Sequence, residues 1–389
     1  MASRVGRRTF LALTAAALAG CTSVGSRVTD RPTQAPGTAA TPSATDTDTA
    51  QTTTRSSTSS GGGSTPPLGD ETLPLPMAPN QLRGEVVSGG PPKDGIPSID
   101  NPTFEPAAEV SGRLASNDIV FGINLGDEAK AYPQNILVWH EICNDVVGGM
   151  PLSITYCPLT GTVLGFERGT TTFGVSGRLV NNNLIMYDRG TERWWPQVLA
   201  TSIPSPWNPD RTTRSLREQR LVWTTWDRWK STHPDTVVLT EDTGFARNYD
   251  GDPYGAYNHP DRSGYYSPEA APMFRSLSDD DRYQPKTVVM GARTAEGAVA
   301  FRKRSLLAQH LMAGELAGTP VLAVHEPQLD TGYVYLNPEG HEFTFEDGQV
   351  VDGNGTAHHP AELELDRIHT FDAMWFAWSG FYPNTAVYD

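Results

Sequence analysis

Cysteine is scarce in this chain of 389 residues, which contains only Cys21, Cys143 and Cys157. Three cysteines do not make a disulfide framework, although a single bond between Cys143 and Cys157 remains open. The spacings of dedicated metal sites, Cys-x-x-Cys and His-x-x-x-His, do not occur. A strand-to-helix phosphate loop and the Gly-x-Ser-x-Gly elbow are also missing. These absences exclude a disulfide-stabilised scaffold, a zinc ribbon, a P-loop enzyme and an α/β-hydrolase.

Lysine is scarce as well, and the charge is strongly acidic. Only five of the 30 basic residues are lysine, and the formal net charge is -15. Residues 1–20 carry three arginines and no acid, so the chain without them is near -18. No basic stripe offsets this charge, which argues against nucleic acid as a partner. The acidity and the scarcity of lysine resemble the composition of proteins from salt-loving archaea. Such acidity is tolerated at high salt, because at 1 M the repulsion between carboxylates is screened over about 3 Å.

The N-terminal segment, from Met1 to Cys21, predicts export. Arg7 and Arg8 form a twin-arginine pair, and the apolar stretch 11–18 is too short to span a bilayer alone. A lipobox-like Leu-Ala-Gly-Cys follows at positions 18–21. We expect twin-arginine export, cleavage before Cys21 and a lipid on its thiol, which anchors the chain to the extracytoplasmic face of the membrane. The alternative is an ordinary signal that ends in a chance cysteine.

The composition then changes twice along the chain. Residues 21–76 are rich in Thr, Ser, Gly and Pro and predict a disordered tether. Aromatic residues begin in earnest only at Phe104, so residues 77–389 form the expected globular region, long enough for two modest cores or one large domain. No segment after residue 20 is apolar and long enough to cross a membrane.

The globular region repeats itself weakly. The stretch Ile119–Leu152 resembles Val288–Val321, and the two align from end to end without a gap. Near the ends of the two parts, a shorter constant offset aligns Trp226, Trp229, Pro234 and Thr236 with Trp375, Trp378, Pro383 and Thr385. We predict two modules, about 105–245 and 285–389, joined by a connecting segment over 246–284 and related by a pseudo-two-fold axis, the second being degenerate. Coincidence between β-rich segments is the alternative.

Short β-like runs between many Gly and Pro residues predict a β-rich α+β fold. The apolar spacing predicts a helix over Asn135–Val146. Alternation predicts a strand over Leu152–Tyr156, and short apolar runs predict strands over Thr170–Val175 and Leu184–Tyr187.

Reactive residue types occur in the first module where the aligned second module has other residues. Cys157 is the leading candidate, because it ends a predicted strand where backbone N–H groups and Thr160 can stabilise a thiolate. His140 can act as its base or as a metal ligand beside it, and Asn144 lies one helical turn after His140. These three residues are the candidate catalytic set, and Cys157 with His140 are the candidate metal ligands. The competing interpretations are a buried structural thiol and a histidine bonded to a backbone carbonyl.

A second cluster, Thr243–Tyr266, is rich in Tyr, Asp, Gly and Pro and predicts a long ordered loop, which is either functional or a packed linker. Together with neighbours of the Cys157 motif, it supplies the candidate binding residues: Glu141, Tyr156, Thr160, Tyr249, Asp250, Tyr254 and Lys286.

Several motifs together resemble the DUF3179 family over roughly residues 90–389. They are Asp94-Gly95-Ile96-Pro97, Ala131-Tyr132-Pro133, Trp139-His140-Glu141-Ile142, Asn144-Asp145-Val146-Val147-Gly148-Gly149, Tyr156-Cys157-Pro158-Leu159-Thr160-Gly161 and Asp252-Pro253-Tyr254. The resemblance implies a protein of bacteria or archaea, often exported or lipid-anchored, and no known reaction. Many members read Cys-Pro-Leu-Cys-Gly where this chain has Thr160, so a dithiol cycle within the motif is impossible here.

Three functions therefore stand side by side. The first is a ligand- or metal-binding module built around Cys157 and His140, with a soft metal such as copper as one occupant. The second is a thiol-dependent enzyme with Cys157 as nucleophile and His140 as base. The third is a structural envelope protein. The sequence indicates no particular cofactor, reaction or protein partner.

The export signal leads to the first testable prediction. Cys21→Ser should release the mature protein into the medium, because the lipid has lost its attachment atom, whereas Arg7→Lys combined with Arg8→Lys should block export. Fractionation of membrane, medium and cytoplasm, followed by immunoblotting, measures both effects. Unchanged membrane association of the Cys21→Ser variant would contradict the lipoprotein interpretation.

Overall fold

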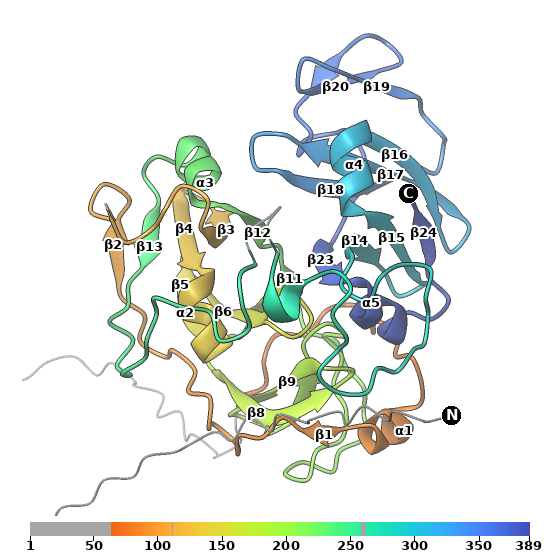
Figure 1. Cartoon of the computed structure of the whole chain (residues 1–389). Helices are drawn as coiled ribbons and strands as arrows, with labels where there is room; N and C mark the ends of the chain where they lie inside the picture. The colour runs from red at the N-terminus through yellow and green to blue at the C-terminus, as the bar shows by residue number, and fades with distance from the viewer. Residues whose placement is uncertain (1–63, 111, 258–261) are drawn as a thin grey trace, which may run out of the picture. The chain divides into compact units, whose positions relative to one another are not determined.

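The computed structural model describes residues 64–110, 112–257 and 262–389. The predicted signal, Cys21 and most of the predicted tether lie outside the described residues. The described chain is rich in strands, has few helices and contains several separate sheets (Figure 1). The β-rich character predicted from composition is confirmed. Among the described residues, no helix has the length and apolarity needed to cross a membrane.

A five-stranded sheet opens the first half of the globular region. Its strand order is β12-β3-β4-β13-β2. The strands are β2 (Phe104–Pro106), β3 (Ile119–Leu125), β4 (Glu128–Pro133), β12 (Val222–Thr225) and β13 (Val237–Leu239). Helix α3 (Trp226–Thr232) joins β12 to β13, and Trp229 packs so closely on Gly122 that a methyl group there would overlap the ring. This contact requires glycine in the middle of β3.

A second sheet, ordered β11-β7-β6-β5, carries the Cys157 motif. Its strands are β5 (Ile142–Val147), β6 (Met150–Cys157), β7 (Thr162–Glu167) and β11 (Glu218–Gln219). Helix α2 (Gln134–His140) leads into β5. Strands β5 and β6 pair antiparallel, with Ile142 opposite Thr155. The end of α2 and the end of β6 therefore lie together.

The helix predicted over Asn135–Val146 is wrong in its second half. Helix α2 ends at His140 because Glu141 adopts a left-handed conformation with φ 58°. The following residues include Ile142, Val146 and Val147, which suit a pleated strand and pair with β6. Asn144 is therefore a strand residue, and the helical i+4 relation to His140 does not exist.

A third sheet has the order β1-β8-β9-β10. Its strands are β1 (Val87–Ser88), β8 (Phe173–Val180), β9 (Asn183–Asp188) and β10 (Trp194–Pro196), and helix α1 (Pro79–Gly84) precedes β1. The strands predicted over Thr170–Val175 and Leu184–Tyr187 correspond to β8 and β9 with shifted ends. The predicted tether ends earlier than residue 76, because Leu68 forms a bridge with Leu216 and Leu73 packs on the core.

The second half of the globular region has a similar sequence of elements. Two four-stranded sheets are ordered β23-β14-β15-β24 and β16-β17-β18-β22, and a smaller sheet is ordered β19-β20-β21. The strands are β14 (Val288–Arg293), β15 (Ala298–Arg302), β16 (Leu311–Leu316), β17 (Thr319–Glu326), β18 (Thr331–Leu336), β19 (Phe343–Glu346), β20 (Gln349–Asp352), β21 (Ala357–His358), β22 (Arg367–Ile368), β23 (Thr370–Met374) and β24 (Ala386–Tyr388). The helices are η1 (Gly264–Tyr266), α4 (Lys303–Gln309) and α5 (Trp375–Phe381).

Several helices and strands of the first half have counterparts of the same length in the second. The bounds of α2, β5, β6 and β7 recur in α4, β16, β17 and β18 with one constant shift in numbering, and those of α3 and β13 recur in α5 and β24 with a second, smaller shift. The Trp229 contact recurs as well, since Trp378 packs on Gly291. The indole N–H groups of Trp229 and Trp378 each donate to a threonine, Thr236 or Thr385, at 3.0 Å.

A buried ion pair joins the two halves. The Arg293 guanidinium donates to both Glu218 oxygens at 2.7 and 2.8 Å and also to the Val198 carbonyl. Burial by itself would raise the pKa of Glu218, but Arg293 and the nearby His369 outweigh that effect and lower it. Burial lowers the pKa of His369 to about 4, so this histidine is neutral near pH 7 and its contact with Glu218 is no ion pair.

This ion pair predicts a large loss of stability on truncation. Glu218→Gln should lower the free energy of unfolding by about 3–5 kcal/mol, because it leaves the buried Arg293 charge without a partner. Urea denaturation followed by tryptophan fluorescence measures the change. The matched control is Arg302→Gln, which removes the more exposed pair with Asp389 and should cost less than about 1 kcal/mol. Equal effects of the two substitutions would contradict the assigned role.

Candidate functional site

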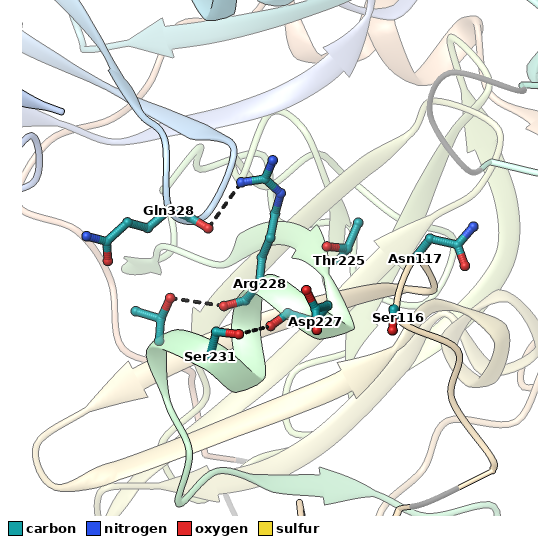
Figure 2. Close-up of a pocket in the computed structure, with 8 residues that line it drawn as sticks. Ser116, Asn117, Thr225, Asp227, Arg228, Ser231 and Gln328 are labelled. Atoms are coloured by element: carbon teal, nitrogen blue, oxygen red, sulfur yellow. Dashed lines mark hydrogen bonds between the residues drawn. The ribbon is translucent and has the colours of Figure 1, made fainter. Parts of the chain in front are cut away.

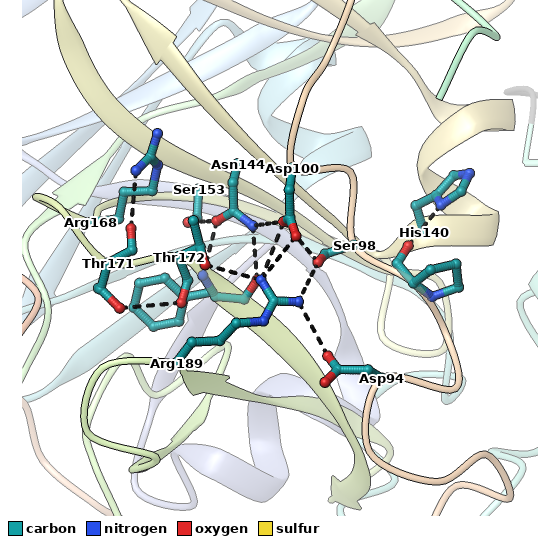
Figure 3. Close-up of polar contacts among 12 residues, drawn as sticks. Asp94, Ser98, Asp100, His140, Asn144, Ser153, Arg168, Thr171, Thr172 and Arg189 are labelled. Atoms are coloured by element: carbon teal, nitrogen blue, oxygen red, sulfur yellow. Dashed lines mark hydrogen bonds and ion pairs between the residues drawn. The ribbon is translucent and has the colours of Figure 1, made fainter. Parts of the chain in front are cut away.

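The first-half motif residues hold the segment 94–100 against the sheets (Figure 3). Ile99 forms a parallel bridge with Cys143 of β5. The Arg189 side chain reaches both Asp94 and Asp100, at 3.3 and 3.2 Å. The segment is therefore fixed by backbone pairing, by ion pairs and by the two residues described next.

Both ring nitrogens of His140 have hydrogen-bond partners in this arrangement. Its Nδ1 lies 2.7 Å from the Pro97 carbonyl, which can only accept, so Nδ1 carries the proton and donates it. Its Nε2 lies 2.6 Å from the Tyr249 hydroxyl and accepts from it. Burial is the main cause that lowers the pKa of His140, which keeps the ring neutral. No lone pair is left for Cys157 or for a metal ion.

Asn144 is also fully engaged. Its amide donates to Asp100 at 2.6 Å and to the Phe173 carbonyl at 2.8 Å. Its oxygen accepts from the Ser153 hydroxyl and from the Phe173 backbone N–H. Asn144 thereby links β5 to β6, β8 and the segment 94–100, which is a structural function.

Cys157 does not belong to the hydrogen-bond network of His140 and Asn144. The Cys157 thiol is 1% exposed, belongs to the core cluster under β8 and β9, and accepts the Leu184 backbone N–H at 3.3 Å. Thr160 lies close enough to lower the pKa of this thiol, while its hydroxyl is hydrogen-bonded to Thr162 and Asn183. Burial outweighs these effects and, with the charge of Glu141, raises the pKa of Cys157 to about 11. Within the described chain no hydrogen bond joins Cys157 to His140 or Asn144, so the predicted three-residue constellation is not formed.

Glu141 is the unusual neighbour of Cys157. Its side chain is 7% exposed, and burial raises the pKa of its carboxyl to about 8. In the part of the chain that the structure describes, no protein group hydrogen-bonds this carboxyl. Its backbone carbonyl, by contrast, accepts the Tyr156 N–H at 2.8 Å and holds the left-handed turn in place. Glu141 thus carries a protonated, unpaired acid at neutral pH.

Two tyrosines complete what we name the thiol–carboxyl cluster: Glu141, Cys157, Tyr254 and Tyr265. Burial, followed by the charges of Glu141 and Cys157, raises the pKa of Tyr254. Burial and Cys157 raise the pKa of Tyr265, whose hydroxyl donates to the Leu159 carbonyl at 2.8 Å. The two rings lie 5.9 Å apart. The loop predicted over Thr243–Tyr266 therefore does reach the Cys157 motif, through Tyr254 and Tyr265.

The other predicted binding residues are either engaged in hydrogen bonds within the fold or exposed to solvent. Tyr156 is buried on the other side of β6 from Cys157, within 3.2 Å of the Gln134 amide. Thr160 bonds to Thr162 and Asn183, Tyr249 bonds to His140, and Asp250 is exposed. The amine of Lys286 is buried against Tyr265 and donates to its carbonyl, and burial with the nearby Arg262 lowers the pKa of Lys286 to about 7.

A comparison with protein families gives one match. A profile described as a protein of unknown function, DUF3179, matches residues 93–385. The chain belongs to the DUF3179 family. Comparisons with curated protein sequences and with solved structures found no match.

The structure of this DUF3179 protein does not favour a preformed metal centre. Among the residues described, no group of three or more His, Cys, Asp or Glu side chains is arranged to hold a metal ion. Cys143 and Cys157 are both unpaired thiols, and their side chains enter different core clusters. The disulfide that the sequence left open is therefore not formed in this structure.

A separate groove lies between helix α3 and the turn after β17 (Figure 2). It has a volume of about 610 Å³, and it is lined by residues with polar side chains: Ser116, Asn117, Thr225, Asp227, Arg228, Ser231, Thr232 and Gln328. Arg228 donates across it to the Pro327 carbonyl at 2.6 Å. None of the residues predicted from the DUF3179 motifs lines this groove.

Sequence reasoning missed Tyr265, the backbone N–H of Leu184 and the clamp formed by Arg189. Tyr265 lies in the tyrosine-rich stretch 243–266, and the density of aromatic residues there is the signal that could have found it. Leu184 acts through its backbone, for which the side-chain pattern gives no signal.

The coupling of Glu141 to Cys157 leads to a prediction of thiol reactivity. Iodoacetamide should alkylate Cys157 slowly at pH 8 and faster toward pH 11, because only the thiolate reacts. Glu141→Gln should raise the rate several-fold near pH 9, since it removes the charge that raises the thiol pKa. Mass spectrometry of the Cys157 peptide measures the rate, and Glu128→Gln, which changes a half-exposed carboxyl, is the control. Rapid alkylation of the native protein at pH 7 would contradict this description.

Proposed function

We propose that this DUF3179 protein is exported, lipid-anchored on the extracytoplasmic face of the membrane, and binds a small polar ligand at the thiol–carboxyl cluster. The observation that carries the proposal is the Glu141 carboxyl, which is buried beside Cys157 and has no hydrogen-bond partner among the described residues. The residue keeps only 7% of its surface in contact with solvent, so few water molecules can serve the carboxyl. A ligand that accepts or donates a hydrogen bond there would supply the partner that the described chain does not.

The backbone at Glu141 determines where the acid lies. A left-handed residue at a helix C-terminus is usually glycine or asparagine, because other side chains are strained there. Glu141 occupies that conformation with φ 58°, and His310 has a similar φ of 68° at the equivalent turn of the second half. The conformation therefore belongs to the scaffold, and the feature particular to the first half is the buried acid that the turn carries.

The chemistry of the cluster favours a hydrogen-bonding ligand. Near pH 7 the Glu141 carboxyl is protonated and can donate, the Tyr254 hydroxyl can donate or accept, and Cys157 remains a thiol. Tyr254 is partly exposed and belongs to the loop that covers the cluster, so a small movement of its side chain would admit a ligand. A metal ion is less favoured, because only Glu141 and Cys157 are conventional ligands here and both nitrogens of His140 are occupied.

A thiol-dependent enzyme is the second candidate. The Leu184 N–H donates a hydrogen bond to the Cys157 sulfur, as a site that stabilises a thiolate would require. In that reaction Glu141, rather than His140, would take the thiol proton, and it could do so only in its ionised form, above a pH of about 8. A thiol pKa of about 11 makes this candidate weaker than ligand binding.

We also propose that the two halves arose by duplication and are related by a pseudo-two-fold axis. The shared strand orders, the two constant shifts in numbering and the paired Trp–Gly contacts support this. Each half also has strands of an additional sheet at the same point of the chain order, β8–β10 after β7 and β19–β21 after β18. Coincidence would have to reproduce every one of these features.

Ligand binding is tested by thermal-shift screening of the full-length protein with small carboxylates, polyols, amines and Cu⁺. A compound present at 100 times its dissociation constant stabilises the folded state by about 2.7 kcal/mol. We expect at least one compound to raise the melting temperature of the native protein, with the shift lost in Glu141→Gln and Tyr254→Phe and retained in Glu128→Gln. A panel without any hit, or a shift that survives Glu141→Gln, would contradict the proposal.

A further inference from the structure

The turn between β20 and β21 carries an Asn-Gly-Thr triplet at positions 354–356. This is the one Asn-x-Ser/Thr triplet of the sequence whose middle residue is not proline. The same triplet is the acceptor signal for asparagine-linked glycosylation, which requires a surface site in an exported protein. Residues 353–357 are all exposed.

The turn is held by groups other than the Asn354 side chain. The Asp352 carboxylate accepts the backbone N–H groups of Asn354 and Thr356, each at 2.9 Å. Gly355 supplies the left-handed conformation, with φ 81°, that the reversal requires. Within the described residues, no hydrogen bond engages the Asn354 side-chain amide. The Nδ2 atom of Asn354, which would accept the sugar, is therefore exposed to solvent. The turn does not depend on any hydrogen bond of this atom.

Exposure in the folded state is decisive for this protein. A chain that leaves the cell by the twin-arginine route crosses the membrane already folded, so an acceptor buried by folding would never meet the transferring enzyme. Asn354 satisfies this condition. Asn101, in Asn-Pro-Thr, is also exposed but is excluded by Pro102.

We propose that Asn354 is a glycosylation site that receives an oligosaccharide from a lipid-diphosphate donor on the outer side of the membrane. In the transfer, the Nδ2 atom of Asn354 forms a bond to the anomeric carbon of the first sugar. The bond from that carbon to the phosphate oxygen breaks, the lipid diphosphate leaves, and the amide proton passes to the transferring enzyme. The proposal rests on the export included in the proposed function.

The test is peptide mass spectrometry of the full chain isolated from the membranes of its source organism. We expect the Asp-N peptide that begins at Asp352 to carry a series of hexose-type mass additions, which are lost in Asn354→Gln and Thr356→Ala and kept in Thr356→Ser. The peptide containing Asn101 serves as an internal control and should be unmodified. Because the Asn354 side chain is exposed and makes no hydrogen bond in the described chain, Asn354→Gln should leave the melting temperature unchanged.

The outcomes that would overturn the inference are distinguishable. An unmodified Asn354 in a chain recovered from the outer face of the membrane overturns glycosylation and leaves export intact. A chain recovered only from the cytoplasm overturns both export and glycosylation. Modification that persists in Thr356→Ala would also exclude this route of transfer.

Discussion

The left-handed turn at Glu141 is the constraint on which the first-half site depends. It ends α2 directly after His140 and starts β5 at Ile142, so that the chain passes from helix to strand within one residue. The Glu141 carbonyl then accepts the Tyr156 N–H, which aligns β6 and brings Cys157 to the end of α2. A glycine would make the same turn at lower cost. Glutamate at this position places a carboxyl beside the Cys157 thiol. Without that carboxyl, the end of α2 would be an ordinary helix terminus and not a candidate binding site.

The motif residues divide into two networks because β5 and β6 present alternate side chains to opposite faces. Tyr156 and Cys143 belong to the core that includes α2 and Tyr249, whereas Cys157 and Ile142 belong to the core that includes β8 and β9. His140 bonds to Tyr249 and to the segment 94–100, and so serves the first core. Proximity along the backbone therefore does not bring the imidazole and the thiol together.

More of the scaffold than of the candidate site could be predicted from the sequence. Alternation located β6, a short apolar run located β9, and the ungapped internal match anticipated that α4, β16 and the start of β17 would follow the order of α2, β5 and the start of β6. The helix was extended too far because its pattern of apolar residues at Ile136, Leu137, Ile142 and Val146 fits a helix as well as a helix followed by a strand. Only the backbone conformation of Glu141 distinguishes the two, and glutamate gives no warning of positive φ. Glu141 and Tyr254 were among the predicted residues, but their partnership with Cys157 depends on a contact between segments far apart in the chain.

The second half offers a comparison that bears on function. At the position that corresponds to Glu141, His310 also has a positive φ, 68°, so the turn belongs to the scaffold and not to the acid. The expectation that reactive groups are confined to the first half is too simple, since His310, His325 and Glu326 stand where Glu141, Tyr156 and Cys157 stand in the first. These second-half groups are only partly paired. The Nδ1 atoms of His310 and His325 lie 2.9 Å apart, but the Nε2 atom of His325 and the Oε2 atom of Glu326 are buried without a hydrogen-bond partner among the described residues. Incomplete pairing at these positions therefore occurs in both halves and does not by itself mark a site. What distinguishes the first half is the set of groups brought together there, since a protonated acid lies beside a thiol and a tyrosine hydroxyl, each of which can hydrogen-bond a ligand from solution.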